Sequence, residues 1–290
     1  MNAIIIGING QDGFYLNKLL SAKQINVIGI ARSKGDWIQG DVTDFPFISE
    51  LIKKHQPQYI FHLAANSSTR HDLIFENHET IATGTINVLE SAYRFSKNSK
   101  IFICGSGVHF KNNGFPVSET DEFFANSPYA VSRISSVYAA RYYREIGLKT
   151  YVGYLFHHES PLRKKTHISK MTTDFIKSLN AESKTKLKIF DPTVKKEWAF
   201  AQDIAEGMFA LISQNETFEA CIGTGESYSI EEWLKTCFAI KGLNYIDHVD
   251  FEKTEFKPEY NILVSNPLTM NKIGWKFKTT FHELAKIMME

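Results

Sequence analysis

Three side chains in the middle of the sequence have the types and spacing needed for proton transfer at a carbonyl or an alcohol. Tyr129 and Arg133 lie four residues apart in a predicted helix over 129–146, so they share one helix face. A fixed cation beside a phenol stabilises the phenolate, so the tyrosine can act as acid or base. Ser106 ends a predicted strand and is placed to hold the substrate oxygen in line with Tyr129. Taken alone, Tyr129 is more typical of a packing residue, so its catalytic role depends on the rest of the sequence.

A glycine-rich segment near the N-terminus has the spacing of a phosphate-binding loop. Gly7, Gly10 and Gly13 follow the apolar run Ala3–Ile6 and precede a predicted helix over 13–22. The first glycine permits a tight turn, the second lets the backbone approach a pyrophosphate, and the third lets helix and strand pack closely. The helix N-terminus then presents unpaired N–H groups and the positive end of its dipole. A tight turn without a ligand is the alternative interpretation.

The end of the second predicted strand indicates which dinucleotide binds. NAD-binding proteins place an acidic residue there, whereas this sequence has Arg32, Ser33 and Lys34. Basic and hydroxyl side chains suit a 2′-phosphate, so NADP is favoured over NAD. Asp41 and Val42 follow the third predicted strand, where they would meet the adenine. Alternatively, Arg32 and Lys34 only line a solvated loop.

The composition limits the class of protein. The 290 residues are 43% hydrophobic and 22% charged, with a formal net charge of +1, which is typical of a globular protein. A basic surface for nucleic acid or for an anionic membrane is not indicated, and no apolar run approaches the roughly 20 residues of a membrane span. The three cysteines contain no CxxC pair and favour neither a disulfide framework nor a metal site. We therefore expect a cytoplasmic protein with a small-molecule substrate.

The order of apolar segments predicts an α/β fold. Runs of strand length alternate with amphipathic segments of helix length, which is typical of a Rossmann-type, doubly wound parallel sheet. The runs are Ala3–Ile6, Val27–Ile30, Tyr59–Leu63, Lys100–Cys104 and Tyr151–Phe156. We expect a dinucleotide-binding domain over 1–156, to which about 191–222 returns. Residues 157–190 and 223–290 are expected to form a smaller mixed lobe that binds the substrate.

Several segments resemble the extended short-chain dehydrogenases/reductases and, within them, the GDP-mannose 4,6-dehydratases. Two blocks are specific to this branch: Gly10-Gln11-Asp12-Gly13-Phe14-Tyr15-Leu16 and His158-Glu159-Ser160-Pro161. Further matching segments are His62-Leu63-Ala64-Ala65, Ser127-Pro128-Tyr129-Ala130-Val131, Lys196-Glu197-Trp198 and Phe256-Lys257-Pro258-Glu259. The resemblance implies a cofactor, NADP, on the N-terminal part, a GDP-linked sugar on the C-terminal part, and a role in surface-glycan biosynthesis.

The resemblance also implies which further residues bind the two ligands. At the cofactor it adds Gln11, Asp12, Leu63, Ala64, Ala65 and His158 to the glycine loop, Tyr129 and Arg133. At the substrate it places Ser67, His157, Glu159, Lys170, Lys196, Lys257 and Glu259. The basic segment 161–167 is either a solvated surface or part of a diphosphate clamp.

The sequence departs from the family pattern at its catalytic positions. Arg133 stands where the family has lysine; it keeps the charge but is bulkier and cannot give up a proton. Val108 stands where the dehydratases carry a glutamate that removes the C5 proton and helps to expel the C6 hydroxyl, and valine can do neither. His109 is adjacent, but in an extended segment it would point elsewhere.

Departures also occur at the substrate and at the subunit contacts. His157 stands where the family has asparagine, and Lys196 and Lys257 stand where it has arginines, so charge is kept but bidentate geometry is lost. The arginine-rich insertion that follows the second strand in the dehydratases, and that supports their tetramer, is missing. A homodimer is therefore expected.

Four functions are compatible with these residues. The preferred one is an NADP-dependent C4 keto-reductase or dehydrogenase that acts on a GDP-linked 6-deoxy hexose or heptose, because all the parts needed for hydride transfer are present. A GDP-mannose 4,6-dehydratase is the main alternative and fits the overall resemblance, although Val108 removes the expected base. Other C4 chemistry, such as epimerisation, and a non-catalytic nucleotide-sugar-binding relative also remain open.

Overall fold

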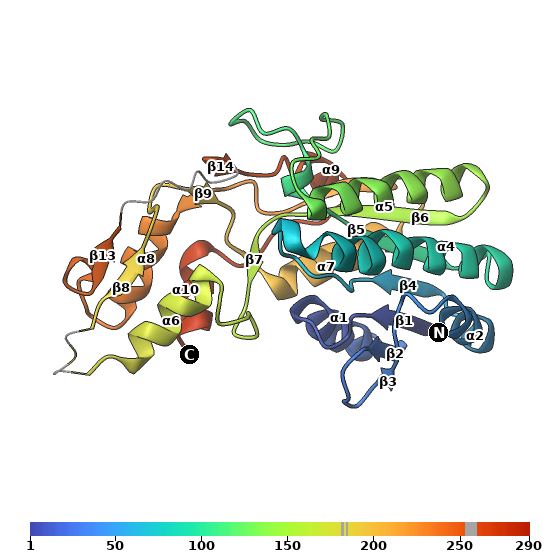
Figure 1. Cartoon of the computed structure of the whole chain (residues 1–290), viewed down its shortest axis with the longest axis horizontal. Coiled ribbons are helices and arrows are strands. Elements are labelled where there is room, and N and C mark those ends of the chain that lie inside the picture. Colours follow the sequence, from blue (N-terminus) through green and yellow to red (C-terminus); the bar gives the residue numbers. More distant parts are fainter. Residues whose placement is uncertain (181–182, 184, 253–259) are drawn as a thin grey trace.

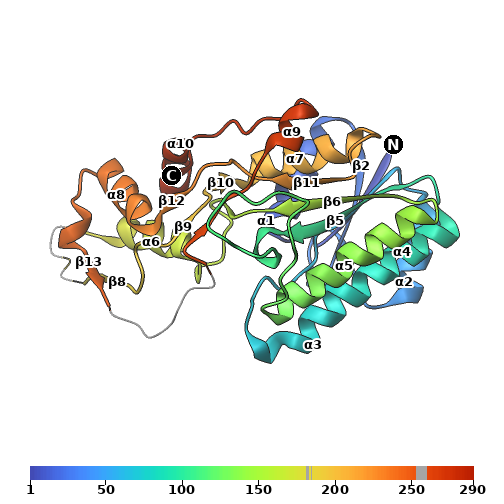
Figure 2. The same cartoon turned by 90° about the horizontal axis from the view of Figure 1, so that it is seen from above.

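The computed structural model of the chain describes residues 1–180, 183, 185–252 and 260–290. These residues form a large sheet with helices on both faces, and beside it a smaller group of helices and short strands (Figure 1). The view from above shows the same two regions, with long helices lying side by side along the large sheet (Figure 2). The predicted α/β class, with a Rossmann-type parallel sheet, is confirmed.

The large sheet has the strand order β11-β6-β5-β4-β1-β2-β3 within the described residues, and every neighbouring pair is parallel. Its strands are β1 (Asn2–Ile6), β2 (Asn26–Ala31), β3 (Ile38–Gln39), β4 (Tyr59–His62), β5 (Lys100–Ser106), β6 (Lys149–Leu155) and β11 (Glu219–Ile222). Each predicted apolar run forms one of them. β3 and β11 are not among these runs, because two or four residues at the edges of a sheet carry little pattern.

Helices cover both faces of this sheet, as its strands of continuous apolar residues require. α1 (Gln11–Ala22) and α7 (Ala201–Ser213) pack together on one face. α2 (Phe45–His55), α4 (Gly84–Phe95) and α5 (Pro128–Glu145) pack side by side on the other. Leu16 is fully buried on the first face, and burial of such a side chain contributes roughly 2 kcal/mol.

Short helical elements lead from β4 into α4. They are η1 (His71–Leu73), α3 (Ile74–Asn77) and the π-helical segment η2 (His78–Thr83). A π-helical turn widens a helix locally and is frequent at functional sites. Here it follows α3 and leads directly into α4.

Local capping determines where the helix of Tyr129 begins. Ser127 is the N-cap of α5, and its Oγ accepts from the Ala130 backbone N–H at 3.2 Å. Pro128 is the first helical residue, where its missing N–H costs nothing and its fixed φ suits the helix. Tyr129 is therefore held in the first turn of α5 with its side chain toward the sheet edge.

The second region contains three helices and three small sheets among the described residues. The helices are α6 (Ile168–Ser178), α8 (Ile230–Ile240) and α10 (Phe281–Met289). The sheets are β10 (Ala199–Phe200) with β7 (His158–Glu159); β12 (Tyr228–Ser229), β9 (Lys195–Lys196) and β14 (Ile262–Leu263); and β13 (Val249–Phe251) with β8 (Leu187–Ile189). η3 (Gly107–His109) and η4 (Tyr245–Asp247) are single turns, and α9 (Leu268–Lys272) packs on β11.

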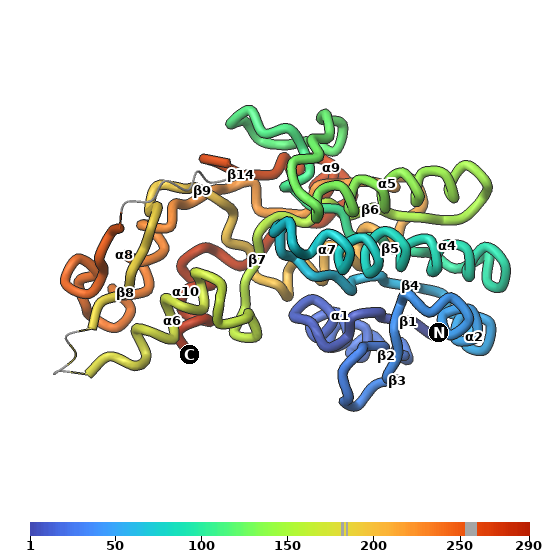
Figure 3. The backbone as a smooth tube through the Cα atoms, viewed as in Figure 1, coloured from blue at the N-terminus to red at the C-terminus, as the bar shows by residue number. Residues whose placement is uncertain are grey.

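The two regions share one apolar core. Trp198 and Trp233 stack with ring centroids 4.4 Å apart in the second region. They belong to the same buried cluster as Leu16 and Met208 under the sheet. The chain passes from β6 through β7 into α6, so residues 156–167 bridge the two regions (Figure 3).

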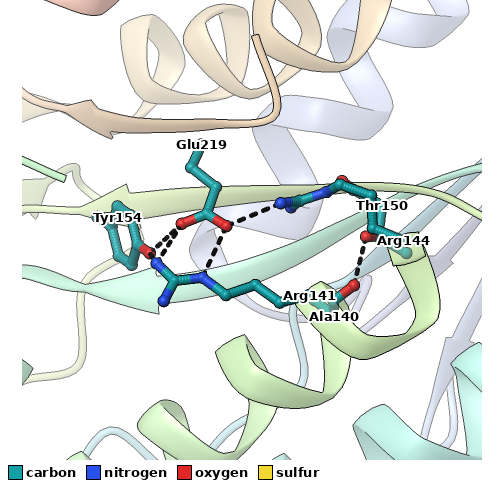
Figure 4. Close-up of polar contacts among 6 residues, drawn as sticks. All are labelled: Ala140, Arg141, Arg144, Thr150, Tyr154 and Glu219. Carbon is teal, nitrogen blue, oxygen red and sulfur yellow. Dashed lines mark hydrogen bonds and ion pairs between the residues drawn. The ribbon is translucent and has the colours of Figure 1, made fainter. Parts of the chain in front are cut away.

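A charged cluster attaches the edge strand β11 to the rest of the sheet (Figure 4). Glu219 accepts from Arg141 at 2.9 and 2.7 Å and from Arg144 at 2.9 Å, both on α5. Tyr154 of β6 donates to Glu219 at 2.6 Å. Although burial opposes the charge, these donors hold the pKa of Glu219 below its usual value. The carboxylate thus ties α5, β6 and the edge strand β11 together.

Candidate functional site

A cleft lies along the carboxyl ends of β1, β4, β5 and β6, facing the second region. It encloses about 770 Å³, a size typical of small-molecule and cofactor sites. Its walls include many of the residues predicted from the sequence: Gly7, Gly10, Gln11, Asp12, Gly13, Leu63, Ala65, Ser67, Ser106, Tyr129, Arg133, His157, His158 and Lys196. This edge is the usual ligand position in open parallel sheets.

The glycine loop has the geometry of a phosphate site. Gly7 has a φ of +94°, and a Cβ there would lie 2.7 Å from the Ala64 nitrogen. A Cβ on Gly13 would lie 2.4 Å from the Gly7 carbonyl oxygen, so both glycines are required by the turn itself. Gly10 differs, because among the described atoms only the Gly7 oxygen, at 3.3 Å, lies within 4 Å of an added Cβ. The open space above Gly10, and the start of α1 without a side-chain cap, fit a pyrophosphate.

The predicted adenosine-binding residues lie beyond this cleft. Arg32 is exposed and lies 3.3 Å from Glu76. Ser33 accepts from the Asn9 side chain at 3.1 Å, which joins the end of β2 to the glycine loop. Asp41 accepts from the Thr43 backbone, and Val42 is buried. Ala64 packs against the turn at Gly7, as described above.

The tyrosine and arginine of α5 meet as their spacing predicts. Arg133 Nε donates to Tyr129 Oη at 3.1 Å, and its Nη1 donates to the Cys104 carbonyl at 2.9 Å. Arg133 is buried, and burial opposes its charge, but Tyr129 and Cys104 keep its pKa above the ordinary value. Ser106 Oγ accepts a long hydrogen bond from the Val108 N–H at 3.5 Å. All three predicted catalytic side chains thus border the same cleft.

The two residues after Gly107 face in different directions. Val108 lines the cleft, whereas His109 is fully buried and packs against Phe110, Phe123 and Tyr154. The prediction that His109 points elsewhere holds, but the reason differs: the segment is the helical turn η3 and not an extended strand. Burial, with a contribution from Arg133, lowers the pKa of His109 to about 3. Neither side chain supplies a carboxylate beside Ser106.

A cluster of cations lies on the opposite wall. Glu159 is fully buried, and its Oε2 accepts from Ser169 Oγ at 2.6 Å. Arg163 Nε lies 3.2 Å from one carboxylate oxygen and Lys196 Nζ 3.6 Å from the other, but neither contact has hydrogen-bond geometry. Although burial opposes its charge, the two cations hold the pKa of Glu159 low. Arg163 and Lys196 both line the cleft, while Glu159 lies behind them.

Other predicted substrate residues have different surroundings. His157 Nε2 lies 2.9 Å from Tyr260 Oη, and burial keeps the pKa of His157 well below its usual value, so this imidazole is neutral. Lys170 pairs with Asp174 at 2.9 Å and is not among the cleft residues. Lys257 and Glu259 lie outside the described residues. The cleft also includes Phe190, Asp191 and Tyr260, which carried no recognisable motif in the sequence.

Among the described residues, no group of three or more His, Cys, Asp or Glu side chains is arranged to hold a metal ion. No helix in the described ranges has the length and apolarity that crossing a membrane requires.

The fold and cleft first define a class, an α/β protein with the parallel sheet, glycine loop and tyrosine helix of the extended short-chain dehydrogenases. Comparison with known families narrows it, because the profile described as GDP-mannose 4,6 dehydratase matches residues 4–288. The chain therefore belongs to the GDP-mannose 4,6-dehydratase family, which modifies nucleotide-linked sugars.

Relatives in this family match almost the whole chain. GDP-mannose 4,6 dehydratase 1 of Arabidopsis thaliana is 28% identical over 319 residues, covering 99% of this chain and 88% of the relative. GDP-mannose 4,6 dehydratase of Homo sapiens is 24% identical over 334 residues, covering 99% and 90%.

Solved structures share the fold over similar lengths. UDP-glucose 4-epimerase of Thermotoga maritima with UDP-glucose has a TM-score of 0.88 at 19% identity, covering 100% of this chain and 97% of that one. dTDP-glucose 4,6-dehydratase of Bacillus anthracis in complex with NAD has 0.86 at 17%, covering 100% and 95%. RMD from Pseudomonas aeruginosa complexed with NADPH has 0.85 at 16%, covering 99% and 97%.

Proposed function

We propose that the protein is an NADP-dependent oxidoreductase that acts as a keto-reductase or dehydrogenase at C4 of a GDP-linked 6-deoxy hexose or heptose. The observation that carries the proposal is Val108 on the cleft wall beside a complete set of hydride-transfer residues. Reduction of a ketone needs a proton donor and a group that orients the carbonyl, and Tyr129 and Ser106 are suited to these tasks. Dehydration needs a further base, which valine cannot supply.

The chain's own residues would control the proton. A bound nicotinamide would supply the hydride, and Tyr129 would donate the proton to the carbonyl oxygen of the substrate. Arg133, held by the Cys104 carbonyl, donates to Tyr129 Oη and stabilises the phenolate that remains. Ser106 is positioned to donate to the carbonyl oxygen. Because Arg133 cannot lose its proton, its role is fixed charge and orientation.

The cofactor proposal depends on the glycine loop and on Arg32. The loop fits a pyrophosphate, and Arg32 with Ser33 at the end of β2 suits a 2′-phosphate. The solved neighbours from Bacillus anthracis and Pseudomonas aeruginosa bind NAD and NADPH respectively, which supports a nicotinamide dinucleotide in general. Arg32 favours the phosphorylated form here.

The substrate proposal depends on the excess of positive charge in the cleft. Arg163 and Lys196 line it, and the only carboxylates among its described lining residues are Asp12 and Asp191. This balance suits a diphosphate. We assign the sugar nucleotide to 157–190 and 223–290, and the dinucleotide to 1–156 with about 191–222. We also propose a cytoplasmic homodimer that acts in surface-glycan biosynthesis.

A GDP-mannose 4,6-dehydratase is the second candidate. The family profile and the names of the relatives favour it. The same Tyr129 and Arg133 would serve its hydride transfers, but its elimination step would need another base for the C5 proton. Val108 is the residue that weighs against this function.

Two incubations separate the candidates. GDP-4-keto-6-deoxymannose with NADPH should be reduced, so cofactor absorbance should fall in proportion to the sugar added. When GDP-mannose is incubated with NADP, mass spectrometry should show that the GDP-mannose is unchanged. Loss of one water from GDP-mannose would instead establish the dehydratase. A Tyr129→Phe variant, with cofactor affinity measured as a control, should lose more than about 100-fold of turnover.

A further inference from the structure

The two blocks that are most specific to this branch of the family contact one another. Gln11 and Asp12 open α1, and His158 and Ser160 lie on the bridge from β6 to the second region. Ser160 Oγ donates to Gln11 Oε1 at 2.7 Å, and Gln11 Nε2 donates to the His158 carbonyl at 3.4 Å. His158 Nε2 lies 2.8 Å from Asp12 Oδ1. The phosphate loop is thereby joined to the start of the substrate-binding part.

The surroundings of the His158 ring indicate its protonation state. Its Nδ1 lies 2.6 Å from the Phe156 carbonyl oxygen, and its Nε2 faces the Asp12 carboxylate. A carbonyl oxygen and a carboxylate are both acceptors, and a neutral imidazole has one N–H for the two of them. An imidazolium has two N–H groups and satisfies both. The side chain is 11% exposed, so solvent cannot readily replace either partner.

We propose that Asp12 and His158 form an ion pair that fastens the phosphate loop to the substrate-binding bridge and neutralises the Asp12 carboxylate where the cofactor pyrophosphate would bind. His158 is a positioning residue, because it acts through Asp12 and the loop. The inference rests on the proposed function only in that it takes the ligand at the glycine loop to be a dinucleotide.

Charge explains why the pair is needed. Asp12 lies in the first turn of α1, where the helix dipole stabilises a carboxylate but where a pyrophosphate also binds. An uncompensated carboxylate at that point would repel the ligand. The cation of His158 removes the repulsion, and the hydrogen bond turns the carboxylate toward the bridge.

The other groups around the pair act in opposite directions. Arg163, from the loop after β7, favours ionised Asp12 and opposes charge on His158. His157, the preceding residue, is neutral. Burial opposes both charges, yet Asp12 raises the pKa of His158, while His158 and Arg163 lower that of Asp12. The contribution of His158 to stability is therefore complete below about pH 6.5 and is lost as the pH rises through its folded pKa; that of Asp12 is lost in acid.

NMR of the free protein tests the protonation state without a cofactor. Imidazole nitrogen shifts, assigned by comparison with His158→Gln, should show both ring nitrogens protonated at pH 7, and Asp12→Asn should lower the His158 pKa. A neutral His158 ring at pH 7, or a His158 pKa that does not change in Asp12→Asn, would overturn the proposal.

Cofactor binding tests the role of the pair. His158→Gln should weaken NADPH binding about tenfold, the effect of roughly one pKa unit of interaction, because Asp12 is left uncompensated. The NADPH affinity of the double variant Asp12→Asn/His158→Gln should return to within about threefold of the wild-type affinity. The control His282→Gln, which changes an exposed histidine, should bind NADPH as the wild type does.

Thermal unfolding of the same variants gives a readout besides binding. The two single substitutions should be non-additive, with the double variant more stable than their sum predicts. Additive melting temperatures, or unchanged NADPH binding by folded His158→Gln, would contradict the inference. If the wild type binds no dinucleotide, the proposed function fails, whereas the NMR titration and the unfolding cycle still decide whether the ion pair exists.

Discussion

Glu219 and Glu159 are both carboxylates withdrawn from solvent, and each lies near two basic side chains from other elements. At the sheet edge, Arg141, Arg144 and Tyr154 donate to both oxygens of Glu219 at 2.6 to 2.9 Å. In the cleft, Ser169 is the hydrogen-bond donor found for Glu159 among the described residues, and Arg163 and Lys196 stand at 3.2 and 3.6 Å without hydrogen-bond geometry.

The difference separates a cluster that holds the fold from one that is prepared for a ligand. Buried polar groups in native proteins are normally satisfied, so unsatisfied ones need an explanation. Both oxygens of Glu219 have donors, and neither of its two cations, which belong to α5, lines the cleft. The cations near Glu159 keep donors free and line the cleft. An anion there would complete the network that the protein leaves open.

The largest expected effect is on stability at the sheet edge. Glu219→Gln removes the charge while keeping the shape, and it leaves Arg141 and Arg144 without their anion. Glutamate 219 is 14% exposed, and breaking a largely buried pair costs about 3 kcal/mol. We expect that loss in denaturant unfolding, with kcat unchanged in the folded protein. The control is Glu216→Gln, which changes an exposed glutamate. Equal stability of the two variants would mean that Glu219 does not stabilise the fold.

His109 packs against Tyr154, the residue that donates to Glu219, and it directly follows Val108 of the cleft wall. Its pKa is lowered to about 3 by burial first, and then by Arg133 and Arg141. The pKa of His109 in the folded protein lies below its unfolded value of about 6.5. The neutral ring therefore contributes to stability at neutral pH, and this contribution is lost as the pH falls. Between pH 7 and pH 5 the expected loss is about 2 kcal/mol.

His109→Phe tests this expectation, since phenylalanine suits the neighbouring rings of Phe110 and Phe123. The variant should be as stable as wild type at pH 7 and should lose about 2 kcal/mol less between pH 7 and pH 5, measured by urea unfolding. Parallel pH curves for the two proteins would mean that His109 is not a source of acid instability.

A third substitution tests the cleft side of the comparison. Lys196→Met keeps the contact with the Trp198 ring, where the ammonium lies 4.5 Å from the centroid, but removes a cation from the cleft. We expect the KM for the GDP-sugar to rise about tenfold, or about 1.4 kcal/mol. Glu159 keeps Ser169 and Arg163 as neighbours, so the loss of stability should be smaller than that of Glu219→Gln. The matched variant Arg144→Met should do the reverse. If both variants changed only stability, the distinction between the clusters would fail.

The features that could be predicted from the sequence are those with short-range spacing. Gly7, Gly10 and Gly13 lie within one loop, and Tyr129 and Arg133 lie one helical period apart. The sequence therefore indicated the loop, the pair and the parallel sheet around them. Contacts between distant segments had no such signal. Asp12 and His158 are separated by 146 residues, and Arg141 and Glu219 by 78.

Short elements were equally hard to predict. The strands of two or three residues in the second region are too brief for a period of two to be recognised. For this reason nothing in the sequence indicated that Phe190 and Tyr260 line the cleft. The resemblance identified His158 and Glu159 as ligand residues, but it could not show that one lies beside Asp12 and that the other lies behind two cations.

The smallest expected effect concerns Glu76, a carboxylate that is more exposed than Glu219 and Glu159. Glu76 lies 3.3 Å from Arg32, and the two side chains are 37% and 60% exposed. A surface pair of this kind contributes at most about 1 kcal/mol, yet it competes with the 2′-phosphate for the proposed NADP-selecting arginine. Glu76→Gln should therefore tighten NADPH binding two- to threefold and leave NADH binding unchanged. Calorimetry at low and high salt, with Glu79→Gln as the control, would detect the gain in NADPH affinity. The gain should shrink at high salt, because salt screens the pair. An equal gain in NADH affinity would mean that Glu76 does not act through the 2′-phosphate.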